Sequence, residues 1–222
     1  MRKPPAVMVS AMVLATIVAA GCRKEQTAPP PDPRAEAKNV FSLFFDGARE
    51  QFLARLDGTV AELTTAGNLF NYARANMNFR KAFIQAYGKS VWDKFGLGSS
   101  DLDSDKRLIF DEIDRSDLKI DGDQATLAYK KPRAAELSSL RLVKFDNGWK
   151  VKASSFSPPG EKGDKAVAVL PLLTAIVVKY QRAIGKPGIK PQDITYELSR
   201  ESDEMFGKTH IEPHRFDIDN IQ

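Results

Sequence analysis

Apolar residues recur at helical spacing soon after residue 35. Steps of three and four separate the members of one long stripe: Phe41, Phe44, Phe45, Ala48, Phe52, Leu56, Val60 and Leu63. This period predicts a helix with one apolar face. Gly47 and Gly58 interrupt the stripe, so it forms either one bent helix or two.

A second helical region is expected to follow the first. Gly67-Asn68 is a plausible stop, and apolar side chains then return at helical spacing as far as Tyr87. Gly88 is placed to end that helix. A short third helix is expected over residues 90–95, before the glycine- and serine-rich linker 96–101.

The middle of the chain has the pattern of strands. Apolar or alternating runs there are separated by turn residues and cover 108–114, 118–120, 124–130, 138–145 and 149–154. Asp121-Gly122-Asp123 signals one turn. Asp146-Asn147-Gly148 lies between two alternating runs, which is the strongest local signal for a hairpin. We therefore expect an antiparallel meander in this region.

The last third of the chain is predicted to be helical. Residues 166–178 form a 13-residue run of mostly apolar side chains, too short to cross a bilayer. Pro171 either begins this helix or kinks it. Residues 186–191 form a rigid connector, and Pro191 suits the first turn of a last helix that ends near Asp203.

The first 21 residues have the three regions of a secretory signal. Arg2 and Lys3 form a positive head, residues 6–20 are almost wholly apolar, and small residues precede Cys22. The segment Ala19-Ala20-Gly21-Cys22 resembles the lipobox of bacterial lipoproteins, with Ala19 in place of the usual leucine. The resemblance implies cleavage before Cys22 and fatty acids such as palmitate on its thiol. The alternative is an ordinary signal peptide, or an uncleaved anchor, that contains a cysteine.

Residues 22–37 are expected to be a proline-rich tether between the lipid and the folded domain, because four prolines fall within residues 29–33. Cys22 is the only cysteine, which excludes an internal disulfide. In lipoproteins of two-membrane bacteria an aspartate after the cysteine favours the inner membrane. Arg23 therefore favours the periplasmic face of the outer membrane. The formal charge of +4 falls to +2 without Arg2 and Lys3, so no nucleic-acid partner is expected.

The order of elements resembles an NTF2-like (cystatin-like) domain. The similarity is carried by the Phe-rich helical region and by the segments 121–127 and 146–151. It implies an α+β fold at 38–157, in which N-terminal helices pack on a curved antiparallel sheet that forms a cone with a pocket at its open end. Residues 160–222 lie outside that pattern and are expected to form a C-terminal helical extension. The family includes isomerases, dehydratases and non-catalytic binding modules, so the fold does not select a function.

Two groups of residues have the composition of metal ligands. His210 and His214 are the only histidines, and Pro213 opposes a helix that would bring them together. Asp101, Asp103 and Asp105 alternate as in a calcium loop, with Glu112 at the twelfth position, but Lys106 stands where the loop needs glycine. We therefore predict a solvent-facing tail and a polar capping loop, and no metal site.

No catalytic constellation stands out, and no cofactor is expected. An acid with a tyrosine donor could enolise a ketone in a cone-shaped pocket. The candidates are Asp111, Glu112 and Asp114 for the acid, with Tyr72, Tyr87 and Tyr129. Surface carboxylates and core tyrosines are the preferred interpretation. The aromatic stripe Phe41, Phe44, Phe45 and Phe52 forms either simple core or the lining of a pocket.

The function predicted from these patterns is that of a non-catalytic envelope lipoprotein. Its domain would bind a small apolar ligand or a protein partner, while the lipid on Cys22 holds it at the membrane. One alternative is a pocket enzyme of the isomerase or lyase type. Another is a structural envelope protein that oligomerises through its C-terminal helices.

Overall fold

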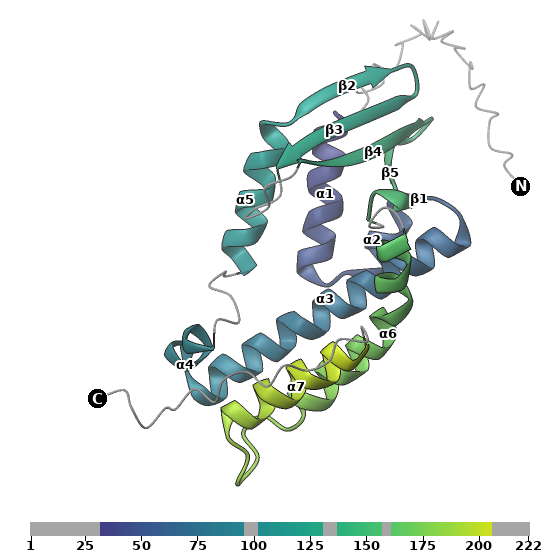
Figure 1. The fold of residues 1–222 in the computed structure, drawn as a ribbon. Coiled ribbons are helices and arrows are strands. Elements are labelled where there is room, and N and C mark those ends of the chain that lie inside the picture. Colours follow the sequence, from purple (N-terminus) through teal and green to yellow (C-terminus); the bar gives the residue numbers. More distant parts are fainter. Residues whose placement is uncertain (1–31, 96–101, 131–136, 157–160, 206–222) are drawn as a thin grey trace, which may run out of the picture.

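The computed structural model describes residues 32–95, 102–130, 137–156 and 161–205 (Figure 1). The fold is α+β. The helices are α1 (Pro33–Asp46), α2 (Arg49–Ala54), α3 (Val60–Tyr87), α4 (Lys89–Lys94), α5 (Leu102–Asp114), the 3-10 helix η1 (Ala153–Phe156), α6 (Glu161–Gln181) and α7 (Pro191–Met205). The strands are β1 (Leu56–Asp57), β2 (Asp117–Asp121), β3 (Gln124–Lys130), β4 (Leu137–Phe145) and β5 (Gly148–Lys152).

The strands form one five-stranded sheet in the order β1-β5-β4-β3-β2. The expected antiparallel meander is confirmed for β2 to β5. The two-residue turn Asp146-Asn147 closes the β4–β5 hairpin, with Phe145 opposite Gly148. β1 pairs with β5 in parallel, so the sheet is mixed and not wholly antiparallel. Residues 153 and 154, expected in the last strand, belong to η1.

The first helix begins earlier than the composition suggests. Asp32 caps α1 by accepting a hydrogen bond from the Arg34 backbone N–H at 3.0 Å, and Pro33 stands in the first turn, where a proline loses no helical hydrogen bond. Residues 33–37 were expected in the tether, and this boundary is wrong. Ala37 is fully buried.

The long apolar stripe is divided between α1, α2 and the start of α3. Gly47, at φ 79°, ends α1 in the left-handed conformation. The stop predicted at Gly67-Asn68 is wrong, because α3 continues from Val60 to Tyr87. A Cβ at Gly67 would lie 3.0 Å from Arg49 Nη2, the flexible end of a side chain on α2. The end at Gly88 and the short helix α4 are confirmed.

Residues 108–114, expected as a strand, belong to α5. Ile113 is fully buried, and Ile109 and Phe110 pack half-buried against the same core, so the apolar residues follow the helical period. Two ion pairs join α5 to α1: Lys38 to Asp114 at 2.6 Å and Lys106 to Asp46 at 2.9 Å. The apolar run Leu108-Ile109-Phe110 is too short for its pattern to distinguish a helix from a strand.

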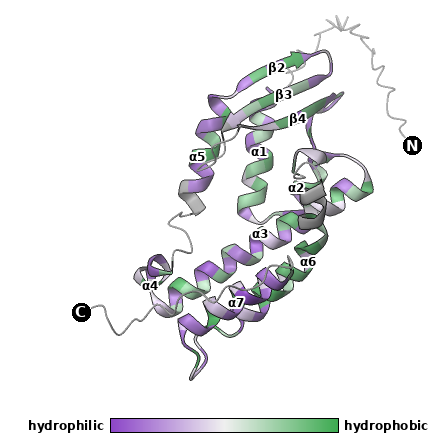
Figure 2. Ribbon diagram, in the orientation of Figure 1, coloured by the Kyte–Doolittle hydropathy of each residue, from purple (hydrophilic) through white to green (hydrophobic). Residues whose placement is uncertain are grey.

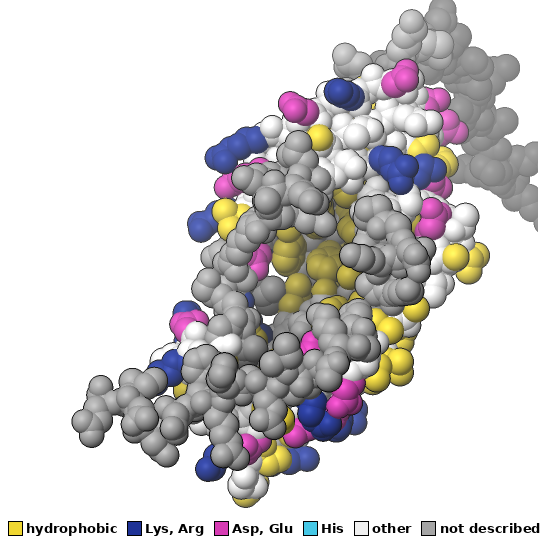
Figure 3. Space-filling model, viewed as in Figure 1, with side chains coloured by type: hydrophobic (Ala, Val, Ile, Leu, Met, Phe, Trp, Pro, Cys, Tyr) yellow, Lys and Arg dark blue, Asp and Glu magenta, His cyan; other side chains and the backbone are white. Residues whose placement is uncertain are grey.

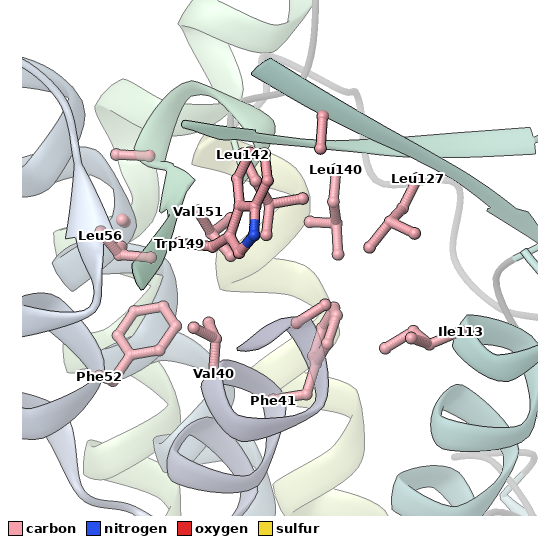
Figure 4. Packing of buried hydrophobic residues seen from close by; sticks show 14 of the residues in the cluster. Val40, Phe41, Phe52, Leu56, Ile113, Leu127, Leu140, Leu142, Trp149 and Val151 are labelled. Atoms are coloured by element: carbon pink, nitrogen blue, oxygen red, sulfur yellow. The ribbon is translucent and has the colours of Figure 1, made fainter. Parts of the chain in front are cut away.

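Two hydrophobic cores share α3. The sheet core lies between the sheet and α1, α2 and α5, and its largest fully buried side chains are Val40, Phe52, Ile113, Leu127, Leu140, Leu142 and Val151 (Figure 4). The helical core joins the second half of α3 to α4, α6 and α7: Ala75, Phe79, Phe83, Trp92, Val177, Tyr180 and Ile194. Helix α6 therefore packs along α3, and α7 packs on α6, so the C-terminal helices lie away from the sheet (Figure 1).

The apolar run at 166–178 lies in α6, which continues through Pro171 and is largely hydrophobic (Figure 2). One side of the helix packs on α3 and is buried at Leu170, Leu173 and Val177. Among the described residues, no helix combines the length and the apolar character that a membrane crossing requires. The predicted helix from Pro191 is confirmed as α7.

Candidate ligand-binding site

The aromatic stripe of the first helices is chiefly core. Phe41 and Phe52 are buried, and Phe44 and Phe45 are half-buried against them. The Phe44 ring lies 5.8 Å from that of Phe45, 5.6 Å from that of Phe52 and 5.4 Å from that of Phe70, all in edge-to-face geometry. Of the two interpretations of the stripe, simple core is therefore correct for most of its length.

One face of the molecule is nevertheless hollowed. Figure 3 shows hydrophobic side chains inside a hollow between the sheet and α3. In the same view α1 lies behind this hollow, and α3 and α5 border it (Figure 1). These three helices contribute the following half-buried hydrophobic residues to the outer layer of the sheet core: Leu43, Phe44, Phe45, Leu63, Ile109 and Phe110. We call the hollow seen in Figure 3 the apolar hollow.

Charged groups at both ends of α5 form ion pairs with α1. Lys106 lies over the Phe110 ring at 5.9 Å and also pairs with Asp46. The hydrogen bonds from Lys106 and Ser42 lower the pKa of the Asp46 carboxyl. The hydrophobic helix faces, with ion pairs at the ends of α5, match the composition of a site for an apolar molecule.

Glu36 is a buried carboxylate that the sequence analysis missed. It is 6% exposed on the first turn of α1. Oε2 accepts a hydrogen bond from Asn39 at 3.4 Å and lies 3.6 Å from Arg55 Nη1, whereas Oε1 is buried without a hydrogen-bond partner in the described structure. Burial raises the pKa of the Glu36 carboxyl, although Asn39, Arg55 and Lys150 oppose the shift.

The structure does not assemble the acid and tyrosine pair considered for enolisation. Asp114 and Glu112 lie on α5 and pair with Lys38 and Arg115, while Asp111 is exposed on the same helix. Tyr129 is buried in the sheet core, where burial raises its pKa to about 12, so the phenol stays protonated at neutral pH.

The other two tyrosines belong to the helical core. Tyr72 packs there half-buried. The Tyr87 hydroxyl donates to the Ile189 carbonyl at 3.4 Å and accepts from the Gly185 N–H at 3.0 Å. This tyrosine therefore ties the end of α3 to the loop between α6 and α7.

The metal-ligand candidates gain no support from the geometry. Asp103 and Asp105 lie on α5, so the predicted polar loop is wrong for these positions; a helix also replaces the loop that calcium binding would need. Asp101, His210 and His214 lie outside the described residues. Within the described ranges, no three His, Cys, Asp or Glu side chains are grouped to hold a metal ion.

A second, shallower hollow lies between α7 and the end of α6, with a volume of about 230 Å³. Its lining includes Tyr180, Ile189, Asp193 and Glu197. Beside it, the Tyr180 hydroxyl donates to Glu201 at 2.6 Å, and Lys179 pairs with the same carboxylate at 2.5 Å. These contacts fasten α7 to α6. No sequence motif pointed to this hollow.

The outer side of α6 carries a stripe without charge over two turns. Ala168, Pro171, Leu172 and Ala175 are exposed there, and Leu172 is 54% exposed. Lys179 follows at the C-terminal end of the stripe.

Comparison with known proteins found no match to a protein family, to a curated protein or to a solved structure.

Proposed function

We propose that this chain is a non-catalytic lipoprotein of the bacterial envelope, held at a membrane by lipid on Cys22. Its α+β half is NTF2-like, and it binds a small apolar ligand in the apolar hollow. In a two-membrane bacterium the protein faces the periplasm from the outer membrane. The observation that carries this proposal is the hydrophobic lining of the hollow beside the sheet (Figure 3).

The physical support comes from the half-buried aromatic side chains. Phe45 and Phe110 retain exposed surface while they pack on the sheet core. Removal of such surface from water stabilises a bound apolar molecule in proportion to the buried area. The helices around the hollow carry half-buried aromatic and aliphatic side chains, so we expect selectivity by size and hydrophobicity.

Ligand binding can be tested with the mature chain, residues 22–222, which contains every described residue. Cys22→Ser removes the lipid, and N-phenyl-1-naphthylamine serves as a fluorescent apolar probe. Phe45→Gln and Phe110→Gln should each weaken probe binding about tenfold or more. Leu172→Gln, on the outer side of α6, is the matched control and should leave binding unchanged. Equal loss in all three variants, or no binding by the parent, would refute the site.

The lipid anchor has a separate test in cells of a bacterium that processes lipoproteins. Cys22→Ser should abolish labelling by a fatty-acid analogue and leave a longer, unprocessed chain. Ala19→Leu restores the usual lipobox residue and should keep both labelling and processing. Membrane retention and processing that survive Cys22→Ser would show that the lipobox assignment is wrong.

A second candidate function is that of a structural protein that oligomerises through its C-terminal helices. The exposed, uncharged stripe on α6 favours it, because a contiguous apolar surface is often an interface. Leu172→Glu should then convert the oligomer to a monomer in sedimentation equilibrium. An unchanged mass would exclude this role for α6.

A further inference from the structure

Strand β2 forms an outer edge of the sheet. It pairs with β3 on one side, and among the described strands none pairs with its other side. Figure 1 shows β2 at the rim of the molecule, away from α3, α6 and α7. An edge of this kind presents unpaired N–H and C=O groups to any second strand of suitable register.

The register with β3 identifies the outward-facing backbone groups. Asp121 and Gln124 close the hairpin across a two-residue turn, so they form a hydrogen-bonded pair. Residues 117, 119 and 121 therefore exchange backbone hydrogen bonds with β3. The N–H and C=O groups of Leu118 and Ile120 point away from the sheet.

The side chains of β2 are suited to a partner strand of the same sequence. Leu118 packs on the sheet core, and Ile120 follows it on the same face but is 57% exposed. Asp117, Lys119 and Asp121 alternate in charge on the opposite face, and all three are exposed. An exposed isoleucine at an open edge is an apolar group that a second strand would cover.

Antiparallel pairing of β2 with a second copy can use the outward N–H and C=O groups of Leu118 and Ile120 in three registers. Centred on residue 119, it sets Lys119 opposite Lys119 and Asp117 opposite Asp121, which is repulsive. Centred on residue 118, it requires the backbone groups of Ser116. The Ser116 carbonyl already accepts from Arg34 Nη2 at 2.8 Å, and its N–H donates to the Ile113 carbonyl at 3.2 Å.

The remaining register is centred on Ile120. It sets Ile120 opposite its copy and Leu118 opposite Gly122 of the hairpin turn. It also places each Lys119 opposite Asp121 of the other chain, which gives two complementary charge pairs. We propose that the chain forms a twofold symmetric dimer in which two β2 strands pair antiparallel about Ile120 and join the two sheets into one. This contact does not depend on the lipid anchor or on the apolar hollow.

The contact is short, so the dimer is expected to be weak in dilute solution. Attachment of both chains to one membrane would raise their effective concentration and favour it. The interface is also self-limiting, because twofold pairing uses the β2 edge of both copies.

Charge reversal tests the register in the unlipidated mature chain with Cys22→Ser. Sedimentation equilibrium should show a concentration-dependent dimer. Lys119→Glu and Asp121→Lys should each weaken it about tenfold, because each change makes both charge pairs repulsive. The double variant Lys119→Glu with Asp121→Lys should restore the parent affinity. A monomer at every concentration, a dimer unaffected by the single changes, or one abolished by Leu172→Glu on α6 would overturn the proposal.

Disulfide trapping gives a second readout that does not require a stable dimer. In the same background Ile120→Cys supplies the only thiol, and the two residues lie about 5.5 Å apart between Cα atoms in a hydrogen-bonded pair. Oxidation should therefore produce a covalent dimer. Lys119→Cys is the matched control, since its copies are diagonal neighbours at about 7–8 Å and should cross-link poorly. Preferential cross-linking of Lys119→Cys would contradict the Ile120 register.

Discussion

At the scale of single residues, Glu36 has the least ordinary environment. A carboxylate in the first turn of a helix normally lies in solvent and interacts favourably with the helix dipole. Here it is buried and pairs with Arg55 at the end of α2, and Oε1 has no hydrogen-bond partner among the described residues. The sequence could not reveal this burial, because the nearby charged residues Arg55 and Lys150 are distant along the chain.

The raised pKa of Glu36 predicts a pH dependence of stability with a definite sign. In the folded state the pKa lies above the unfolded value of 4.5, so the folded protein binds the proton more tightly. The contribution to stability is complete below pH 4.5 and is lost as the pH rises through the folded pKa. Glu36→Gln should remove this loss. Urea denaturation should therefore show the variant gaining stability relative to the parent as the pH rises to 7.

Glu62 provides the matched control for that experiment. Hydrogen bonds from the Thr59 backbone and hydroxyl lower the pKa of its carboxyl in the capping box of α3. Its contribution is present above the unfolded pKa and is lost as the pH falls through the folded pKa. Glu62→Gln should thus have its largest destabilising effect at neutral pH. If both variants showed the same trend, Glu36 would not be the titrating group.

At the scale of elements, local chemistry predicted the parts of the fold that depend on local contacts. The β4–β5 turn at Asp146-Asn147, the end of α3 at Gly88 and the start of α7 at Pro191 all follow from backbone preferences of one or two residues. The errors arose where tertiary contacts decide. Residues 108–110 have the sequence pattern of a strand, but they form part of a helix because α5 packs on α1.

The candidate site shows the same division. Helical spacing identified Phe41, Phe44, Phe45 and Phe52 as an apolar face, and the structure buries most of it. Spacing alone could not show that Phe45 and Phe110, from elements far apart in the sequence, would lie in the outer layer of one core. It also could not show that α6 packs along α3 and α7 packs on α6.

Replacement by alanine should change the stability of the protein in opposite directions at two glycines, Gly67 and Gly47. Gly67 lies inside α3, and the atom nearest to an added Cβ is the flexible end of Arg49, so Gly67→Ala should stabilise the protein by about 0.5–1 kcal/mol. Gly47 has φ 79° and its Cβ would lie 2.8 Å from Arg74 Cζ, so Gly47→Ala should destabilise it by about 1–2 kcal/mol. Urea denaturation at neutral pH measures both. Destabilisation by Gly67→Ala would show that Arg49 is fixed in place.

At the scale of the whole molecule, α3 connects the two cores. Its first half contributes Ala66 and Phe70 to the sheet core, and its second half contributes Phe79 and Phe83 to the helical core. Unfolding of either core would remove half of the surface that stabilises this 28-residue helix. The two cores are therefore expected to unfold together, and the helical extension is part of the same cooperative unit.

The two tryptophans allow this expectation to be tested, since Trp149 lies in the sheet core and Trp92 in the helical core. Trp92→Phe and Trp149→Phe yield single-tryptophan proteins whose urea transitions should coincide. Phe83 is fully buried against Trp92, with ring centroids 5.6 Å apart. Phe83→Ala should cost about 3–5 kcal/mol and shift both fluorescence midpoints equally. Val60→Ala, on the same helix at an 83% exposed position, should shift neither. A shift of the Trp92 transition alone would show that the cores unfold independently.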